Sequence, residues 1–189
     1  MTLSLAMADV LASQAAEAIR AGAPLSHLDM IPAAAYATDR NGVVTYFNSS
    51  CPEFTGRSPQ VGEDRWCVTH KLYTQDGAFL PHDECPMADA IHTGLPVRGI
   101  TAVAEKPDGS RVAFAPVPTP LFGLDGEMVG AINILIDVTQ QQLAAFEFKS
   151  AQARRLANSA GDSRTTLSLR TLADEVDARA AVLRTIPRQ

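Results

Sequence analysis

The sequence lacks the features that mark disulfide-rich, membrane-spanning and secreted proteins. Only three cysteines, Cys51, Cys67 and Cys85, occur in 189 residues. An odd and small number excludes a disulfide scaffold and is typical of reduced cytosolic proteins. No apolar run approaches the ~20 residues of a membrane helix, and residues 1–12 carry Asp9 without a basic segment, so no signal peptide is expected. We therefore predict a cytoplasmic protein without membrane insertion.

Positive charge and histidine are also scarce. Sixteen Lys and Arg residues against 21 Asp and Glu residues give a net charge of −5. Nucleic-acid binding, which needs clustered cations, is not expected. No histidine follows His92, so the C-terminal part cannot supply the phosphoacceptor of a histidine kinase. No nucleophile elbow, phosphate-binding glycine loop or carboxylate pair is present, which predicts a non-catalytic protein.

Two short β-prone runs frame the most informative stretch. Ala34–Thr38 and Val43–Phe47 flank Asp39-Arg40-Asn41-Gly42. The Asn-Gly pair favours a hairpin because both residues adopt positive φ at low cost. Asn48 follows, and we expect its side chain to accept from an amide two or three residues on, capping the short helix Cys51–Thr55.

Helices and three further strands are predicted in the remainder, whereas Gln60–Pro81 shows no regular pattern. Pro116, Pro118 and Pro120 alternate in one strand, so their missing N–H groups share an edge, and the neighbour there is expected to pair only with the first half of that strand. In the last strand, isoleucines alternate with Asn133 and so occupy the opposite face. The predicted helices are Met1–Arg20, a helix that opens at His82–Met87 and ends at Gly94, Gln140–Asn158 and Thr165–Ile186; the strands are Val97–Glu105, Arg111–Phe122 and Glu127–Val138.

Several short motifs, in this order, resemble those of PAS domains. They are Asp39-x-x-Gly42 with Asn48, Thr93-Gly94-x-Pro96, Pro107-Asp108-Gly109, and Gly126-x-x-x-Gly130 leading to Asp137-x-Thr139. The Trp66-Cys67 and His82-Asp83-x-Cys85-Pro86-Met87 pieces resemble a variant in bacterial PAS domains attached to sensor kinases. The resemblance implies an α+β PAS fold: a five-stranded antiparallel sheet with helices on one face over residues 25–139, an N-terminal flanking helix over 1–24 and a C-terminal helical extension over 140–189.

The resemblance also implies a role in bacterial signal transduction. We expect a stand-alone sensory or regulatory module that binds a small ligand or partner protein and relays its state through homodimer or partner contacts. Sensor kinases or response regulators are the expected partners. An apolar pocket with few polar groups is the usual form of a ligand site. The candidates are Trp66, His70, Tyr73, Met87, His92 and Asn133, with ordinary loop packing as the alternative for Trp66 and Tyr73.

A metal sensor is the alternative function. Cys67-x-x-His70 and His82-x-x-Cys85 supply two thiolates and two imidazoles, a donor set that suits tetrahedral zinc. The competing interpretation treats both cysteines as small buried apolar residues. In this interpretation, His82 and Asp83 accept hydrogen bonds from the backbone amides at the start of the following helix.

Haem and flavin are tested against the PAS resemblance. Haem-binding members place the proximal histidine where Val97 stands here, although His92 could ligate iron from the helix. A histidine in the last helical turn also interacts favourably with the helix dipole. Flavin-binding light sensors need a cysteine in the later helix and a glutamine near the end of the last strand. Cys51 precedes that helix and Leu135 holds the glutamine position, so no cofactor is expected, with zinc or haem as alternatives.

The C-terminal extension carries an apolar seam. Its members, at roughly heptad spacing, are Leu169, Leu172, Val176 and Leu183, and Arg179 interrupts them. We expect this seam to dock a partner or a second subunit, with packing back on the domain as the alternative. The helices Met1–Arg20 and Gln140–Asn158 are expected to transmit the signal.

Overall fold

The computed structural model describes residues 3–184 and confirms the α+β class. Its helices are α1 (Leu5–Arg20), α2 (Ser50–Thr55), α3 (Pro86–Thr93), α4 (Thr139–Ser159) and α5 (Ser163–Leu183), with 3-10 helices η1 (Leu25–Met30) and η2 (His82–Glu84). Its strands are β1 (Ala34–Asp39), β2 (Val44–Phe47), β3 (Lys71–Thr74), β4 (Phe79–Leu80), β5 (Ala102–Glu105), β6 (Arg111–Pro116), β7 (Thr119–Phe122) and β8 (Met128–Asp137).

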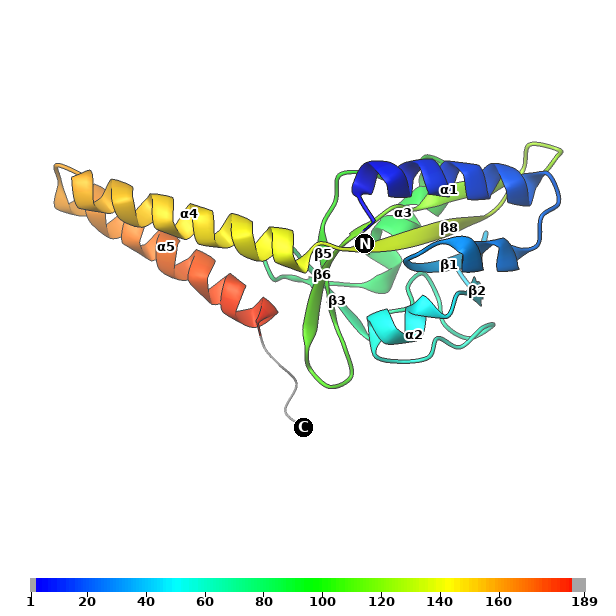
Figure 1. Ribbon diagram of the computed structural model, residues 1–189, viewed down its shortest axis with the longest axis horizontal. Helices are drawn as coiled ribbons and strands as arrows, with labels where there is room; N and C mark the ends of the chain where they lie inside the picture. The colour runs from blue at the N-terminus through cyan, green and yellow to red at the C-terminus, as the bar shows by residue number, and fades with distance from the viewer. Residues whose placement is uncertain (1–2, 185–189) are drawn as a thin grey trace.

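The strands form one antiparallel sheet in the order β2-β1-β8-β6-β5-β3-β4, with β7 paired to β8. Figure 1 shows α1 lying along β8, with α2 on the other side of the domain.

The sheet has eight strands where five were expected. Two additional strands come from Gln60–Pro81, where β3 and β4 form a hairpin that pairs Leu72 with Leu80. The third arises because the strand predicted over Arg111–Phe122 is broken between Pro116 and Thr119 into β6 and β7, which both pair with β8. Strands of two to four residues carry too little alternation to be recognised from sequence.

The prolines of β6 and β7 act as predicted on the neighbouring strand. β5 pairs with β6 only as far as Phe114, because the next residue on the β5 side is Pro116, which has no N–H to donate. β5 therefore begins at Ala102 rather than at the predicted Val97. Alongside the unpaired part, the Arg98 guanidinium donates to the Pro118 carbonyl oxygen at 2.6 Å.

β8 separates two hydrophobic cores, as the alternation of its residues predicts. Ile132 and Ile134 face the first core, which includes α1. The fully buried residues of α1 in this core are alanines, Ala8, Ala12 and Ala15, and their small side chains let the helix lie close to the sheet. Leu11 and Ile19 of α1 pack against the core and are partly buried. Asn133 faces the second core, between the sheet and helices α2 and α3, whose large buried side chains include Tyr36, Leu72, Met87 and Phe114. β8 thus contacts both cores, as do β1, β5 and β6.

The C-terminal extension is a helical hairpin that projects from the end of the sheet (Figure 1). Only Val138 separates β8 from α4. Small buried residues join the two helices: Ser150, Ala153 and Ala157 in α4, and Ala173 and Ala180 in α5. The predicted end of the second helix, Ile186, lies outside the described residues. Within residues 3–184, no helix is long and apolar enough to cross a membrane.

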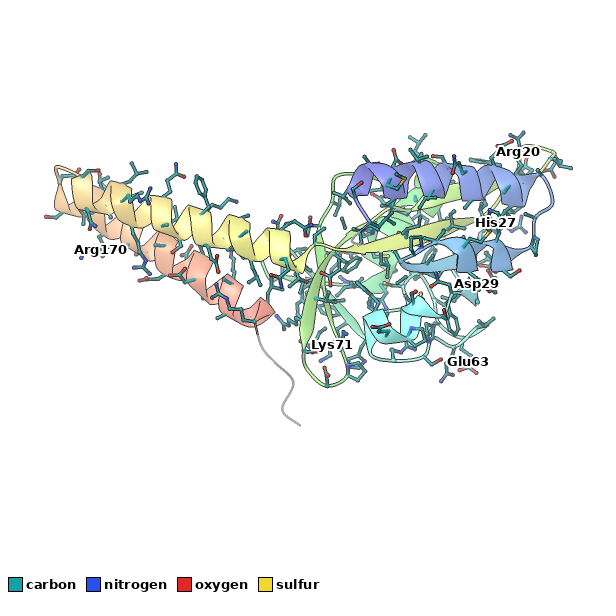
Figure 2. All side chains as sticks on the ribbon, viewed as in Figure 1. Arg20, His27, Asp29, Glu63, Lys71 and Arg170 are labelled. Carbon is teal, nitrogen blue, oxygen red and sulfur yellow. The ribbon has the colours of Figure 1, made fainter. Side chains whose placement is uncertain are left out.

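A charged cluster joins strands β3, β5 and β6. The Glu105 carboxylate accepts from Lys71 Nζ at 3.0 Å, and from Arg111 Nε and Nη2 at 3.0 and 2.7 Å. Lys71 is labelled in Figure 2. The Arg111 guanidinium also lies over the Tyr73 ring, 4.1 Å from its centroid. The hydrogen bonds from Lys71 and Arg111 lower the pKa of Glu105 from 4.5 to about 2.

Glu105→Gln is expected to remove part of the acid sensitivity of the fold. Because the carboxylate has a lowered pKa in the folded protein, it stabilises the fold fully above its usual pKa of 4.5, and this stabilisation is lost as the pH falls towards about 2. Thermal unfolding of wild type and variant should therefore differ most near neutral pH and converge across that window. Glu63→Gln, at an exposed turn position, is the matched control. A difference that is constant with pH would contradict the expectation.

Candidate functional site

Trp66, the only tryptophan of the chain, lies at the centre of the candidate site. Its φ of 65° is the only positive value at a non-glycine residue among residues 3–184. Its N–H donates to the Gly42 carbonyl oxygen at 2.6 Å, and its ring covers Gly42 and lies 5.2 Å from the His92 ring. A bulky side chain in this backbone region is strained, so the surrounding contacts must hold it there.

The Trp66 carbonyl oxygen begins a buried polar network. It accepts from the Tyr36 hydroxyl at 2.9 Å and from the Cys85 thiol at 3.8 Å. Asn133 Nδ2 donates to the Tyr36 hydroxyl oxygen at 3.2 Å, while Asn133 Oδ1 accepts from the Val117 N–H at 2.9 Å. Tyr36, Cys85 and Asn133 are each at most 2% exposed. The network therefore connects β1 and β8 to the residue before α3.

Cys67 brings a second thiol to this network. The Cys67 and Cys85 thiols lie near each other in the same buried cluster. Cys67 Sγ also lies 3.3 Å from Thr69 Oγ1, which is 3.5 Å from His82 Nε2. Since His82 is only half-buried, this chain of polar groups leads from the interior to the surface.

The buried titratable groups of the site differ in their pKa values. Burial raises the pKa of Tyr36 well above its usual value of 10. The hydrogen bond from Cys85 and the charge of His82 lower the pKa of Cys67, while the pKa of Cys85 is raised by its hydrogen bond to Cys67 and by burial.

The third cysteine has a different environment. Burial raises the pKa of Cys51 to about 12, and its thiol donates to the Ala35 carbonyl oxygen at 3.2 Å. Cys51 belongs to α2, on the same side of the sheet as the thiol pair. It provides an internal reference for the chemistry of Cys67 and Cys85.

The predicted pocket residues are divided between two faces of the sheet. Trp66, Met87, His92 and Asn133 share the side of the second core, with the His92 side chain exposed against the Trp66 ring. Tyr73 packs against the first core, where it lines a cavity of about 60 Å³ beside Phe146 and Leu183. His70 is exposed. The sequence could not place Tyr73 because β3 itself was not recognised.

The four residues of the zinc alternative are only partly brought together. Cys67 and Cys85 are in contact, His82 reaches them through Thr69, and His70 is exposed. Among the residues that the structure describes, no three His, Cys, Asp or Glu side chains are arranged to hold a metal ion.

Sequence reasoning missed Tyr36 and Thr69, and it was wrong about Asn48. α2 has Ser49 at its N-cap, without a side-chain bond to the helix. Asn48 instead accepts from the Ala35 N–H at 3.0 Å. The sequence did contain a signal for the burial of Tyr36. This residue lies two positions from Ala34 in a short strand, so the two side chains share a face.

The four residues of the apolar seam of α5 differ in how far they are buried. Val176 and Leu183 are buried within the chain and belong to the first core. Leu169 is half-buried and Leu172 is 49% exposed. Packing back on the chain thus accounts for two of the four residues, and Leu172 remains accessible to a partner.

Comparisons with known proteins place the chain in a family. A search of curated proteins found no match. Similar solved structures include a Rhodobacter sphaeroides LOV protein (17% identity, TM-score 0.48, covering 91% of this chain and 96% of that chain) and the LOV domain of a blue-light activated histidine kinase from Erythrobacter litoralis (21%, 0.44, 57% and 96%). The PAS domain of the fruit-fly ELK potassium channel is another (14%, 0.48, 60% and 92%). A family model described as PAS fold matches residues 28–143, more than half of the sequence, and the chain therefore belongs to the PAS fold family.

Proposed function

We propose that this PAS protein is a non-catalytic sensory module of bacterial signalling, in which β8 passes the state of the buried network to the flanking helices. One observation carries the proposal. Neighbouring residues of β8 lie in different cores. Asn133 hydrogen-bonds Tyr36 in the second core, whereas Ile132 and Ile134 lie in the first core, which includes α1. The same strand continues into α4 after a single residue. A change that moves Tyr36 therefore acts on α1 and α4 together.

The input is a small ligand or a partner protein that meets the Trp66 side of the domain. Trp66, Met87, His92 and Asn133 are its proposed contacts, and no cofactor is required. The output is a homodimer or partner contact made by α1 and the α4–α5 hairpin, with sensor kinases or response regulators as partners. Exposed apolar side chains support this role of the hairpin: Phe148, Leu156, Leu167 and Leu172. A cytoplasmic location belongs to the proposal and is supported by the three unpaired cysteines.

Tyr36→Phe tests the relay through β8. The variant keeps the buried ring but removes the hydroxyl that joins Asn133 to the Trp66 carbonyl. This is expected to cost about 1–3 kcal/mol, because Asn133 Nδ2 loses its partner and the Trp66 carbonyl keeps only the long contact with the Cys85 thiol. Hydrogen exchange followed by mass spectrometry should show faster exchange in β8, in α1 and at the start of α4, with the fold retained.

Tyr46→Phe is the matched control for this experiment. Its hydroxyl donates to Asp29 Oδ2 at 2.8 Å near the surface, and Asp29 is labelled in Figure 2. The control should leave the exchange of α4 unchanged. If Tyr36→Phe altered exchange only around Trp66, the relay through β8 would be wrong.

A further inference from the structure

We propose that Cys67 and Cys85 form an oxidation site that reacts with a hydroperoxide and closes to an intramolecular disulfide. The inference goes beyond the sensory role proposed above, because the reaction of the two thiols does not require that any helix respond to it. It rests on the contact between the thiols and on the groups around them.

The backbone brings the two thiols together from separate segments. Cys85 precedes α3 in an extended conformation, with φ −77° and ψ 162°. Its thiol reaches the Trp66 carbonyl at 3.8 Å, and this carbonyl belongs to the peptide bond that leads to Cys67 in the same buried cluster. Neither cysteine lies inside a helix or strand, so small backbone shifts can bring the sulfurs to bonding distance.

The surroundings favour Cys67 as the attacking sulfur. A thiolate, not a thiol, is the nucleophile, and hydrogen-bond donors and positive charge stabilise it. The Thr69 hydroxyl lies 3.3 Å from Cys67 Sγ, and His82 continues the polar chain towards the surface. Cys67 is 4% exposed, and this polar chain is the proposed approach for a small peroxide.

The reaction balances with a hydroperoxide as the only oxidant. The Cys67 thiolate attacks the outer oxygen of the peroxide, the O–O bond breaks, and the departing alkoxide or hydroxide takes a proton to leave as alcohol or water. Cys67 becomes a sulfenic acid. The Cys85 sulfur then attacks the Cys67 sulfur, the S–O bond breaks, and water leaves with the Cys85 proton. The thiols lose two electrons, the peroxide gains two, and a dithiol reductant reverses the step by exchange.

The disulfide would also alter the contacts of Trp66. Oxidation removes the thiol hydrogen that Cys85 donates to the Trp66 carbonyl. It also ties the Trp66-Cys67 loop to the start of α3, the helix that carries His92 against the tryptophan ring. Since the chain has no other tryptophan, its fluorescence reports on this site alone.

The test uses the full chain, reduced, freed of reductant and then exposed to hydrogen peroxide. After denaturation and alkylation, intact mass should show one added alkyl group instead of three, together with a loss of about 2 Da. Peptide mapping should show a Cys67–Cys85 disulfide, with Cys51 alkylated. Trp66 emission should shift and return on addition of dithiothreitol. Cys51→Ser should behave like wild type, whereas Cys85→Ser should trap oxygen on Cys67, at about 16 Da per atom.

The wild-type mapping decides the proposal even if a variant folds poorly. Oxidation of Cys51 as fast as Cys67, a bridge that includes Cys51, or unchanged thiols at peroxide levels that oxidise free cysteine would each overturn it. Hydrogen exchange of the oxidised protein separates this inference from the sensory role. A disulfide that forms without altering α1 or α4 would retain the oxidation site and count against the relay through β8.

Discussion

Gly130→Ala is expected to destabilise the protein by about 3 kcal/mol or more, since it forces an added carbon against the backbone in the middle of the sheet. Gly130 lies in β8 between two neighbours, opposite Asp39 of β1 and opposite Leu121 of β7. A Cβ at this position would overlap the Thr38 carbonyl group. A backbone carbonyl cannot rotate away as a side chain can, so β1 and β8 would have to separate locally.

Thermal unfolding measures this effect directly. With about 2–4 °C per kcal/mol for a chain of this size, the midpoint should fall by about 6–12 °C. Gly161→Ala is the control, because nothing lies within 4 Å of its added Cβ between α4 and α5. It should change stability by about 0.5 kcal/mol or less. Equal midpoints for the two variants would contradict the close approach of β8 to β1.

Local turn and helix-end signals made much of the fold predictable. Gly42 has φ 79° in the predicted Asn-Gly hairpin, and Gly56 and Gly94 end α2 and α3 in the left-handed conformation. These features depend on a few adjacent residues, whose backbone preferences act in any context. Their order was sufficient to indicate the PAS fold, which the family match confirms.

The candidate site depended on long-range register and was predicted only in part. Tyr36 and Asn133 are 97 residues apart in sequence and meet because β1 pairs with β8 in a register that sets them opposite one another. The alternation in β8 identified the face of Asn133, but no local pattern identifies its partner. The positive φ of Trp66 is equally a product of its surroundings, since tryptophan has no preference for that region.

The apolar seam of α5 shows a related limit. An amphipathic stripe predicts that a helix will cover apolar surface, not which surface that will be. A short connection folds α5 antiparallel to α4. Val176 and Leu183 are therefore buried against the neighbouring helix and the domain. That Leu172 stays exposed can be deduced only once this packing is known.

Asn48→Ala is expected to lower stability by about 3 kcal/mol because it leaves several buried backbone groups without partners. Asn48 Oδ1 accepts from the Ala35 N–H, and the variant loses this bond while it keeps the backbone bond from residue 48 to the Ala35 carbonyl. Asn48 Nδ2 donates to the Ala33 carbonyl at 2.8 Å and lies 3.2 Å from that of Leu28 and 3.4 Å from that of Ile31. One side chain, 2% exposed, thereby joins η1 and the start of β1 to the end of β2.

Asn48→Asp distinguishes this role from helix capping. Aspartate is as good an N-cap as asparagine, and its charge favours the N-terminus of a helix, so a cap would tolerate the change. Here the carboxylate would face the carbonyl oxygens of Leu28, Ile31 and Ala33 with no proton to donate. At neutral pH the variant should be at least as unstable as Asn48→Ala, and it should recover part of the loss in acid, where a protonated aspartate can donate again. Denaturant unfolding of the two variants across pH measures this, and a wild-type midpoint for Asn48→Asp at neutral pH would return Asn48 to the capping role.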